Sequence, residues 1–162
     1  MPPPKSPYPM PLTRVELCTL CLADGQLCVL LGRREQDPFK GHWALPGGLL
    51  RIDLDTSLEQ AAQRVAQERL GLQLPYLRQQ CTVGGPGRDP RAAWSLSVVY
   101  RALTPAQDFH PTAGKRLEQL QWRAVNDAML DATLAFDHHL VIAAAVTDLR
   151  REVDQLEIPF EY

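Results

Sequence analysis

The segment between Trp43 and Leu72 constrains the fold of this chain more than any other stretch. It begins Trp-Ala-Leu-Pro-Gly-Gly and, after a short polar stretch, reaches residues 57–70, where apolar side chains recur near the period of a helix. A polar residue among positions 55–57 can cap the start of this helix, and Gly71 can end it in the left-handed conformation. The segment therefore predicts a glycine-rich loop that leads into a helix.

The remainder of the chain predicts strands and one further helix. Branched and alternating apolar residues predict strands at 12–22, 27–33, 77–83, 94–103 and 117–125, with loops at 84–92 and 104–115. Asp24-Gly25 predicts a hairpin turn. A helix is expected from His138 to about Leu156, with one apolar stripe at Ile142, Val146, Leu149, Val153 and Leu156. Strands intermixed with helices and a hairpin favour a mixed sheet in an α+β domain.

Length and charge limit the functional classes. With 162 residues, the chain can form one full core, which we expect over residues 12–162, behind a disordered Pro-rich tail at 1–11. The formal charge of −2 argues against a nucleic-acid surface on this domain. No apolar run approaches the roughly 20 residues that span a bilayer, and the N-terminus lacks a signal core. We expect a cytoplasmic protein with a small-molecule ligand.

Two of the four cysteines, Cys18 and Cys21, have the spacing of a zinc or redox pair. Residues three apart on a strand point to opposite faces, however, and the chain has no second such pair. We therefore interpret the cysteines as buried reduced thiols, which suits a reducing cytoplasm.

Residues 38–48 and 64–72 resemble a Nudix box, the metal- and diphosphate-binding loop and helix of nucleoside-diphosphate hydrolases. The match is carried by the Trp-Ala-Leu-Pro-Gly-Gly loop and by Arg64, Ala66, Glu68, Gly71 and Leu72. The resemblance implies the α/β/α Nudix fold, a mixed sheet flanked by helices. It also places Val65 and Arg69, and further upstream Thr56, where the family has glutamates, and the interval from Gly48 to Arg64 is two residues longer than the pattern.

The altered helix face bears directly on catalysis. Positions 65, 68 and 69 lie on one face, where three carboxylates would hold Mg²⁺ or Mn²⁺ and activate a water. Here Glu68 alone remains as a catalytic and metal-binding candidate. Arg69 would repel a cation but could pair with a phosphate. Glu59, Asp53 or Asp55 could supply substitute metal ligands, and Glu68 could instead be only a surface partner of Arg64.

The expected ligand contacts come from the loop, the helix and a second stretch. Gly47 and Gly48 let the backbone approach a diphosphate, and the other candidates are the arginines Arg64, Arg69, Arg88 and Arg91. A solvated charged turn explains Arg88 and Arg91 equally well. Phe39, Trp43 or Trp94 could stack on an adenine, although Trp94, on an alternating strand, is expected in the core.

Residues 87–91 and 134–139 refine the resemblance. Both are similar to a Nudix branch that contains ADP-ribose pyrophosphatase-like proteins and the Nudix-type regulators of NAD metabolism. In those regulators a winged-helix DNA-binding domain follows, so either this domain stands alone or such a domain has been removed after Tyr162. Asp137-His138-His139 could serve metal or acid–base chemistry, but a helix cap followed by two histidines explains the residues more simply.

Three hypotheses of function remain. The domain binds ADP-ribose or a related nucleoside diphosphate, with hydrolysis weak or lost, because the metal carboxylates are incomplete. Alternatively it is a Mg²⁺-dependent pyrophosphohydrolase that uses Glu68 with Glu59 or Glu118. The third hypothesis is a regulatory module that forms a homodimer through the C-terminal helix, although core packing accounts for its apolar stripe equally well.

Overall fold

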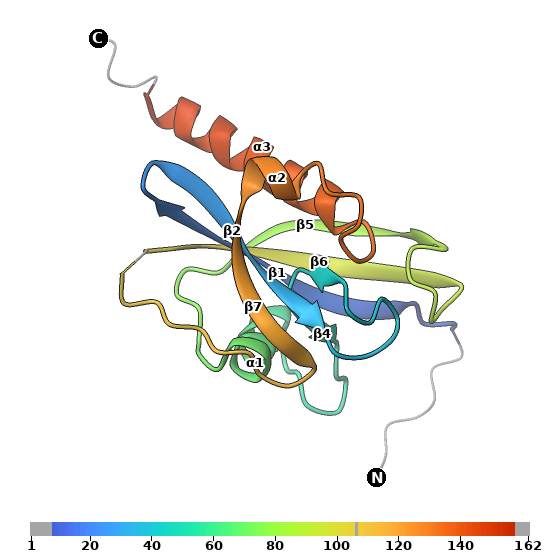
Figure 1. The fold of residues 1–162 in the computed structure, drawn as a ribbon. Helices are drawn as coiled ribbons and strands as arrows, with labels where there is room; N and C mark the ends of the chain where they lie inside the picture. Colours follow the sequence, from blue (N-terminus) through green and yellow to red (C-terminus); the bar gives the residue numbers. More distant parts are fainter. Residues whose placement is uncertain (1–7, 106, 158–162) are drawn as a thin grey trace.

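The computed structural model describes residues 8–105 and 107–157, and most of the expected N-terminal tail lies outside these ranges (Figure 1). Its elements in chain order are β1 (Leu12–Ala23), β2 (Gln26–Arg34), β3 (Trp43–Ala44), β4 (Gly47–Leu49), α1 (Leu58–Leu70), β5 (Arg78–Pro86), β6 (Trp94–Thr104), β7 (Leu117–Ala124), α2 (Val125–Ala128) and α3 (His138–Glu157). No helix in the described part of the chain is long and apolar enough to cross a membrane.

One mixed sheet forms the centre of the domain. Its main path runs β3-β2-β1-β6-β5, with β4 also paired to β1 and β7 to β2. The central pair, β1 and β6, is parallel, whereas the other pairs are antiparallel. The mixed sheet predicted from the sequence is therefore confirmed.

Each face of the sheet packs against a different helix (Figure 1). Alternation along β2 sends Leu30 into the cluster under α1, whereas Val29 and Leu31 join the cluster under α3. The stripe on α3 packs in the same way: Ile142 and Val146 are buried and Leu149 is partly buried, while Val153 is exposed. Burial against the sheet thus accounts for most of the stripe.

The predicted hairpin turn and both predicted ends of α1 are confirmed by the structure. Asp24 and Gly25 have φ of 51° and 74°, which gives the tight hairpin between β1 and β2. Ser57 caps α1, because its side chain accepts a hydrogen bond from the N–H of Gln60 at 3.0 Å. Gly71 ends α1 in the left-handed region, with φ of 72°.

Four details differ from expectation. The glycine-rich loop expected at Pro46-Gly47-Gly48 is wrong in part, because Gly47 and Gly48 belong to β4, where pairing with β1 decides the conformation. The expected loop from residue 84 onward is wrong at its start, because β5 continues to Pro86, paired with β6. The expectation that Trp94 lies in the core is also wrong: this residue is 49% exposed, and its ring covers Gly84, where a Cβ would lie 3.1 Å from it. The short α2 has too few residues for a periodic pattern to reveal it.

The cysteines are free thiols that serve packing. Cys18 is fully buried in the cluster under α3, and burial raises its pKa to about 12. Cys21 instead lines a cavity with Phe109 and Trp122. The two side chains thus have separate surroundings, as their spacing on a strand predicts.

Candidate anion-binding site

The loop between β3 and β4 is held tightly against the sheet. The N–H of Leu45 donates to Nδ1 of His138 at 2.9 Å, which ties the loop to the start of α3. At Gly47, a Cβ would lie only 1.9 Å from Oε2 of the buried Glu16. Glycine is therefore required at position 47 by close approach.

The face of α1 that meets this loop carries a cation. Val65 is fully buried in the core beneath the helix. Arg69 is only 7% exposed, and its Nε donates to the carbonyl oxygen of Gly47 at 2.9 Å. Glu68 accepts a hydrogen bond from Nη1 of Arg64 at 3.2 Å, and its Oε2 also lies 3.7 Å from Nη1 of Arg69. The Glu68 carboxylate therefore lies between two guanidinium groups.

A second loop is hydrogen-bonded to the end of α1. The N–H groups of Thr112, Gly114 and Lys115 donate to the last carbonyl oxygens of the helix at 2.9 Å each. The backbones approach so closely that a Cβ on Gly114 would lie 2.0 Å from the carbonyl oxygen of Glu68. This contact satisfies the helix carbonyls and brings Lys115 and the adjacent Arg116 to the site.

Five arginines from separate parts of the chain line one small pocket between the two loops. They come from β1, β2, α1, the loop before β6 and the loop before β7: Arg14, Arg34, Arg69, Arg91 and Arg116. Among the described lining residues, Asp37 is the one carboxylate; Leu45 and Gly47 complete the floor. The pocket has a volume of about 60 Å³, enough for a phosphate-sized group.

Most of these guanidinium groups are oriented by an acceptor outside the pocket. Arg14 donates through Nε to Glu16 at 2.9 Å. Arg91 makes a bidentate pair with the buried Asp89, at 3.0 and 2.7 Å. Arg34 donates through Nε to the carbonyl oxygen of Pro38 at 2.7 Å. Hydrogen bonds of this kind preorganise an anion site before the ligand arrives.

The arginines also destabilise one another's charge. Burial, followed by the charges of Arg14 and Arg91, lowers the pKa of Arg34 to about 10. Burial also lowers the pKa of Arg69, with Arg116 and Arg14 acting in the same direction. Both side chains remain charged at neutral pH, so a bound anion would relieve the repulsion.

Beneath the pocket lies a buried ionic cluster. Glu16 is 1% exposed, and its Oε1 accepts from Arg14 and, at 3.2 Å, from the hydroxyl of Ser97. Nε2 of the fully buried His138 lies 3.6 Å from the same oxygen. Burial acts to raise the pKa of Glu16, but the charge of Arg14, together with the neighbouring His138 ring, outweighs it and holds the pKa well below its usual range. The cluster therefore supports Arg14 and the Gly47 loop.

A larger pocket adjoins the first and shares Arg69 and Arg116 with it. It has a volume of about 460 Å³ and is lined by residues 49–53, Arg64, Glu68 and Lys115 as well. This volume lies in the range of small-molecule sites. A ligand with a diphosphate could place one phosphate in the small pocket and extend through the larger one.

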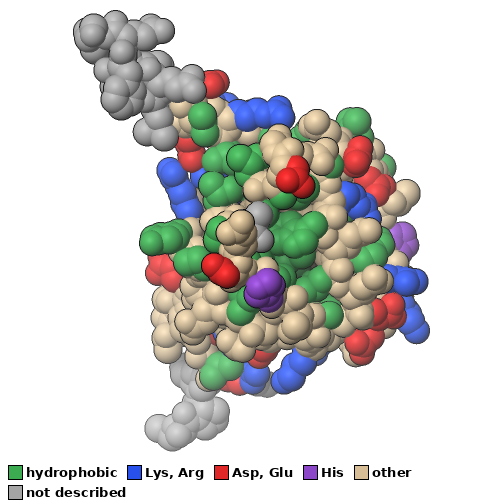
Figure 2. All heavy atoms as spheres, turned by 60° about the vertical axis from the view of Figure 1, so that its left-hand side comes forward, with side chains coloured by type: hydrophobic (Ala, Val, Ile, Leu, Met, Phe, Trp, Pro, Cys, Tyr) green, Lys and Arg blue, Asp and Glu red, His purple; other side chains and the backbone are tan. Residues whose placement is uncertain are grey.

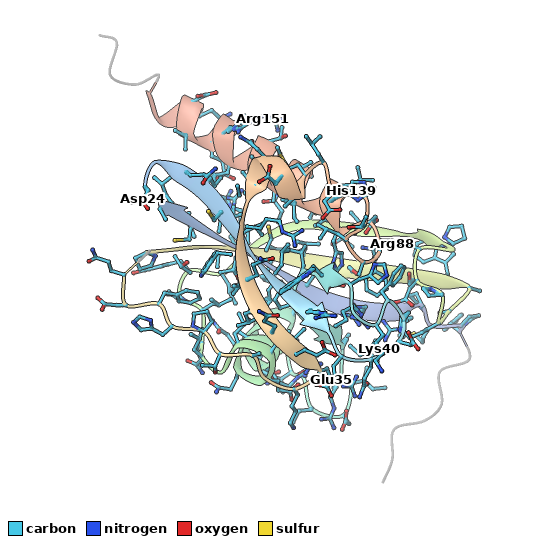
Figure 3. The ribbon with its side chains drawn as sticks, in the orientation of Figure 1. Asp24, Glu35, Lys40, Arg88, His139 and Arg151 are labelled. Carbon is cyan, nitrogen blue, oxygen red and sulfur yellow. The ribbon has the colours of Figure 1, made fainter. Side chains whose placement is uncertain are left out.

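The structure brings together most, but not all, of the residues expected at the site. Gly47, Gly48, Arg64, Arg69 and Arg91 lie in or beside the two pockets. By contrast, the expected ligand residue Arg88 is engaged elsewhere. It donates twice to the carboxylate of Asp137, at 2.8 and 2.7 Å, and once to Ser97, beside the start of α3 (Figure 3).

The histidines and aromatic residues also have defined places. His138 binds the loop at Leu45, and Asp137 is paired with Arg88, so both support structure around the start of α3. The ring of Trp43 lies under Cζ of Arg123, at 5.8 Å. Phe39 packs on Phe136, with their ring centroids 4.7 Å apart.

The available carboxylates do not fit a magnesium site. In the described ranges, no group of three or more His, Cys, Asp or Glu could hold a metal ion. Asp53 and Asp55 are instead paired with Arg51 and Arg64, at 2.7 Å each. Glu118 lies 3.5 Å from Arg33, and Glu59 lies in the first turn of α1, outside the residues that line either pocket.

Sequence reasoning missed three of the pocket arginines, Arg14, Arg34 and Arg116. A signal was present for the first of these: Arg14 and Glu16 are charged residues two apart in an otherwise apolar strand, and two charges on one face of a buried strand must pair. No comparable local pattern marks Arg34 or Arg116.

The apolar cavities lie elsewhere. Figure 2 shows a face on which hydrophobic side chains gather around a hollow. One cavity of about 170 Å³ is lined by Cys21, Ala23, Cys28, Pro105, Phe109 and Trp122. Another, between α3 and the ends of β1, β2 and β6, is lined mainly by leucines and Val153. The first has no basic residue among the described residues that line it, and in the second the one cation among them, Arg150, is accompanied by the carboxylate of Asp154, so neither resembles the arginine-lined pocket.

A mixed sheet between helices, with a Gly-Gly strand followed by a helix beside a cationic pocket, defines an α+β domain with a candidate anion site. The NUDIX domain family matches residues 11–145, so the chain belongs to this family.

Two curated relatives share this domain. The chain is 36% identical over 155 residues to the ADPR responsive transcriptional repressor NtrR of Acinetobacter baylyi, which covers 96% of this chain and 61% of the repressor. It is 31% identical over 115 residues to an ADP-ribose pyrophosphatase of Methanocaldococcus jannaschii, which covers 70% of this chain and 63% of that enzyme. The chain thus spans under two thirds of the length of either relative.

Solved structures agree with this assignment. The NUDIX domain of Shewanella oneidensis NrtR in complex with ADP ribose superposes with a TM-score of 0.80 at 35% identity, covering 90% of this chain and 94% of that one. NrtR from the same organism in complex with a 27mer DNA gives a TM-score of 0.74 at 35% identity, covering 86% of this chain and 63% of that one. These similarities confirm the Nudix fold expected from the sequence.

Proposed function

We propose that this domain binds ADP-ribose, or a closely related nucleoside diphosphate, through arginine side chains in place of a metal ion, with hydrolysis weak or lost. The observation that carries the proposal is Arg69, which donates to the carbonyl oxygen of Gly47 and lines both pockets. A guanidinium there can bind a phosphate directly. The same charge opposes a divalent cation beside Glu68.

The geometry supports an arrangement of the ligand. The diphosphate would lie where the two pockets meet, against Arg69 and Arg116, with Arg34 reaching the phosphate in the smaller pocket. Hydrogen bonds to charged groups contribute about 1.5–3 kcal/mol each. Three such hydrogen bonds together approach the binding free energy of roughly 8 kcal/mol that corresponds to a micromolar Kd, without a metal ion. The nucleoside and terminal ribose would extend through the larger pocket.

Nudix hydrolases generally use divalent metals, but the carboxylates here are paired with arginines and do not fit a site for Mg²⁺ or Mn²⁺. The alternative, a working pyrophosphohydrolase, draws support from Glu68 and from the similarity to an ADP-ribose pyrophosphatase. In that case Glu68 would be the residue on which turnover depends.

The relatives named as DNA-bound or as a repressor are longer than this chain. We therefore place any contact with DNA outside this domain, in agreement with its formal charge of −2. Responsiveness to ADP-ribose would then be the part of such a protein's activity that this domain supplies.

Isothermal titration with ADP-ribose, in EDTA and then in excess Mg²⁺, separates the two readings. Binding in EDTA, with no AMP or ribose 5-phosphate formed on prolonged incubation with Mg²⁺ or Mn²⁺, supports the proposal. No binding at millimolar ligand in either buffer rejects it. Metal-dependent turnover that Glu68→Gln abolishes would establish the hydrolase instead.

A further inference from the structure

Phe136 adopts a backbone conformation that a bulky side chain rarely takes. Its φ is 56°, in the left-handed region, and Phe39, which packs on it, has a φ of 61°. Such conformations persist only where the surroundings impose them, and they cluster at functional sites. Phe136 belongs to the segment before α3, which lines neither pocket, so the proposed function leaves this strain unexplained.

The surroundings that impose this conformation are hydrogen bonds on both sides of the residue. The N–H of Ala135 donates to the carbonyl oxygen of Trp43 at 2.8 Å. On the other side, Arg88 holds the carboxylate of Asp137, and Nδ1 of His138 accepts from the N–H of Leu45. Because the residues on both sides are held, the backbone of Phe136 is fixed and its ring takes one position beside the small pocket.

That place is beneath two arginines of the small pocket. Cζ of Arg14 lies 5.5 Å, and Cζ of Arg34 5.1 Å, from the centroid of the Phe136 ring. Both distances are within the range of cation–π attraction. Phe39 and His138 occupy further sides of the ring, with centroids at 4.7 and 5.2 Å. The ring, which is partly buried, thus contacts four neighbouring side chains.

We infer that Phe136 is a positioning residue of the anion pocket, whose ring holds the guanidinium groups of Arg14 and Arg34 side by side at the pocket wall. This inference rests on the proposed function. The two guanidinium groups repel each other, and the charge of Arg14 contributes to lowering the pKa of Arg34. The negative face of an aromatic ring offsets part of that repulsion before a phosphate arrives.

Removing the ring should therefore change binding through the arginines. Without it, Arg34 keeps its hydrogen bond to Pro38 but loses the ring on which its guanidinium packs, so the ligand must order that group further on binding. Because fewer charges then act together on the phosphates, binding should weaken and also depend less steeply on salt. Loss of a packing contact alone would lower stability but leave the salt dependence as it was.

The experiment compares Phe136→Leu, Phe136→Tyr and Phe136→Gly with the unmodified chain, using ADP-ribose and inorganic pyrophosphate as probes at several salt concentrations. Phe136→Leu should raise Kd for both probes about tenfold, from the loss of two cation–π contacts, whereas Phe136→Tyr keeps the ring and should restore binding. Phe136→Gly removes the ring and the backbone strain together, so it should bind as weakly as Phe136→Leu if the ring, and not the strain, is what the pocket needs. Phe109→Leu is the matched control, because it replaces an aromatic ring in the separate apolar cavity. Its Kd for both probes should equal that of the unmodified chain.

A double-mutant cycle with Arg34→Gln decides whether Phe136 acts through that arginine. Losses that fail to add support the inference, because the part of the ring's effect that acts through Arg34 disappears once Arg34 is gone. Additive losses, or unchanged binding and salt dependence in Phe136→Leu, overturn it while leaving ADP-ribose binding intact. If the unmodified chain binds neither probe, the proposed function itself is rejected and the inference with it.

Discussion

Arg69 and Gly47 are joined by a hydrogen bond of 2.9 Å from Nε of the arginine to the carbonyl oxygen of the glycine. The bond links the last turn of α1 to the first residue of β4 across 22 residues of sequence. It also fixes a buried guanidinium at the junction of the two pockets, where it can act on a bound phosphate.

The first prediction concerns this arginine. Arg69→Gln should weaken ADP-ribose binding in EDTA by roughly 10- to 100-fold, the equivalent of about 1.5–3 kcal/mol for a hydrogen bond to a charged group. Arg69→Lys keeps the charge but not the planar fork, so it should recover only part of the affinity. Titration calorimetry provides the measurement. Arg151→Gln, on the exposed side of α3, serves as the control (Figure 3). Equal affinities for the two glutamine variants would contradict the role of Arg69.

Two arginines of the loop before β6 should behave differently. Arg91 lines the small pocket, so Arg91→Gln should raise the Kd for ADP-ribose about tenfold or more. Arg88 is bound to Asp137 and lines neither pocket, so Arg88→Gln should raise Kd much less than Arg91→Gln does and lower the free energy of unfolding by about 1 kcal/mol. Binding and urea denaturation on the same two proteins test both statements. A larger loss of affinity in Arg88→Gln than in Arg91→Gln would reverse the assignment.

The close approach at Gly47 makes a prediction about stability. In Gly47→Ala the new Cβ would meet Oε2 of Glu16 at 1.9 Å, so the loop or the buried carboxylate must move. Overpacking of this kind costs about 1–3 kcal/mol in unfolding free energy, and the displaced loop should also weaken binding. Gly85→Ala is the control, because a Cβ there meets nothing within 4 Å. If both alanine variants melt at the same temperature, the space at residue 47 is less restricted than the structure indicates.

How far the sequence predicts this molecule depends on how local each signal is. Ser57 and Gly71 mark the ends of α1 because capping depends on neighbours within a few residues. The hairpin at Asp24 follows for the same reason. The extension of β5 to Pro86 could not be predicted, because a pairing partner on β6 decides it.

The sequence predicts only part of the site, because some of its contacts are local and others depend on the whole fold. The box-like segment pointed to Gly47 and Arg69, which lie together as expected. Arg34 and Arg116 reach the pocket only through the sheet and the loop bound to α1, and neither contact has a sequence pattern. Arg88 and Arg91 look equivalent along the chain and differ only because Asp137 and Asp89 hold them in different places.

The last prediction concerns Glu16 and acid. Burial acts to raise the pKa of this carboxyl, but Arg14 and His138 prevail and hold the folded-state pKa below the unfolded value. A carboxylate with a depressed pKa stabilises the fold above the unfolded pKa of about 4.3, and this contribution is lost as pH falls toward the folded pKa. Glu16→Gln removes the charge at every pH and leaves Arg14 buried without its partner. It should therefore cost roughly 3–5 kcal/mol near pH 7.

The difference between Glu16→Gln and the unmodified chain should shrink as the pH falls below about 4.3, because the carboxylate of the unfolded state then binds a proton while the folded one stays ionised, and the unmodified chain loses stability. Urea denaturation from pH 7 to pH 3 measures the two curves. Glu35→Gln, at an exposed position, should stay within about 0.5 kcal/mol of the unmodified chain throughout. A Glu16→Gln curve that runs parallel to the unmodified one across this range would show that the buried carboxylate does not carry the charge that holds Arg14 in the pocket.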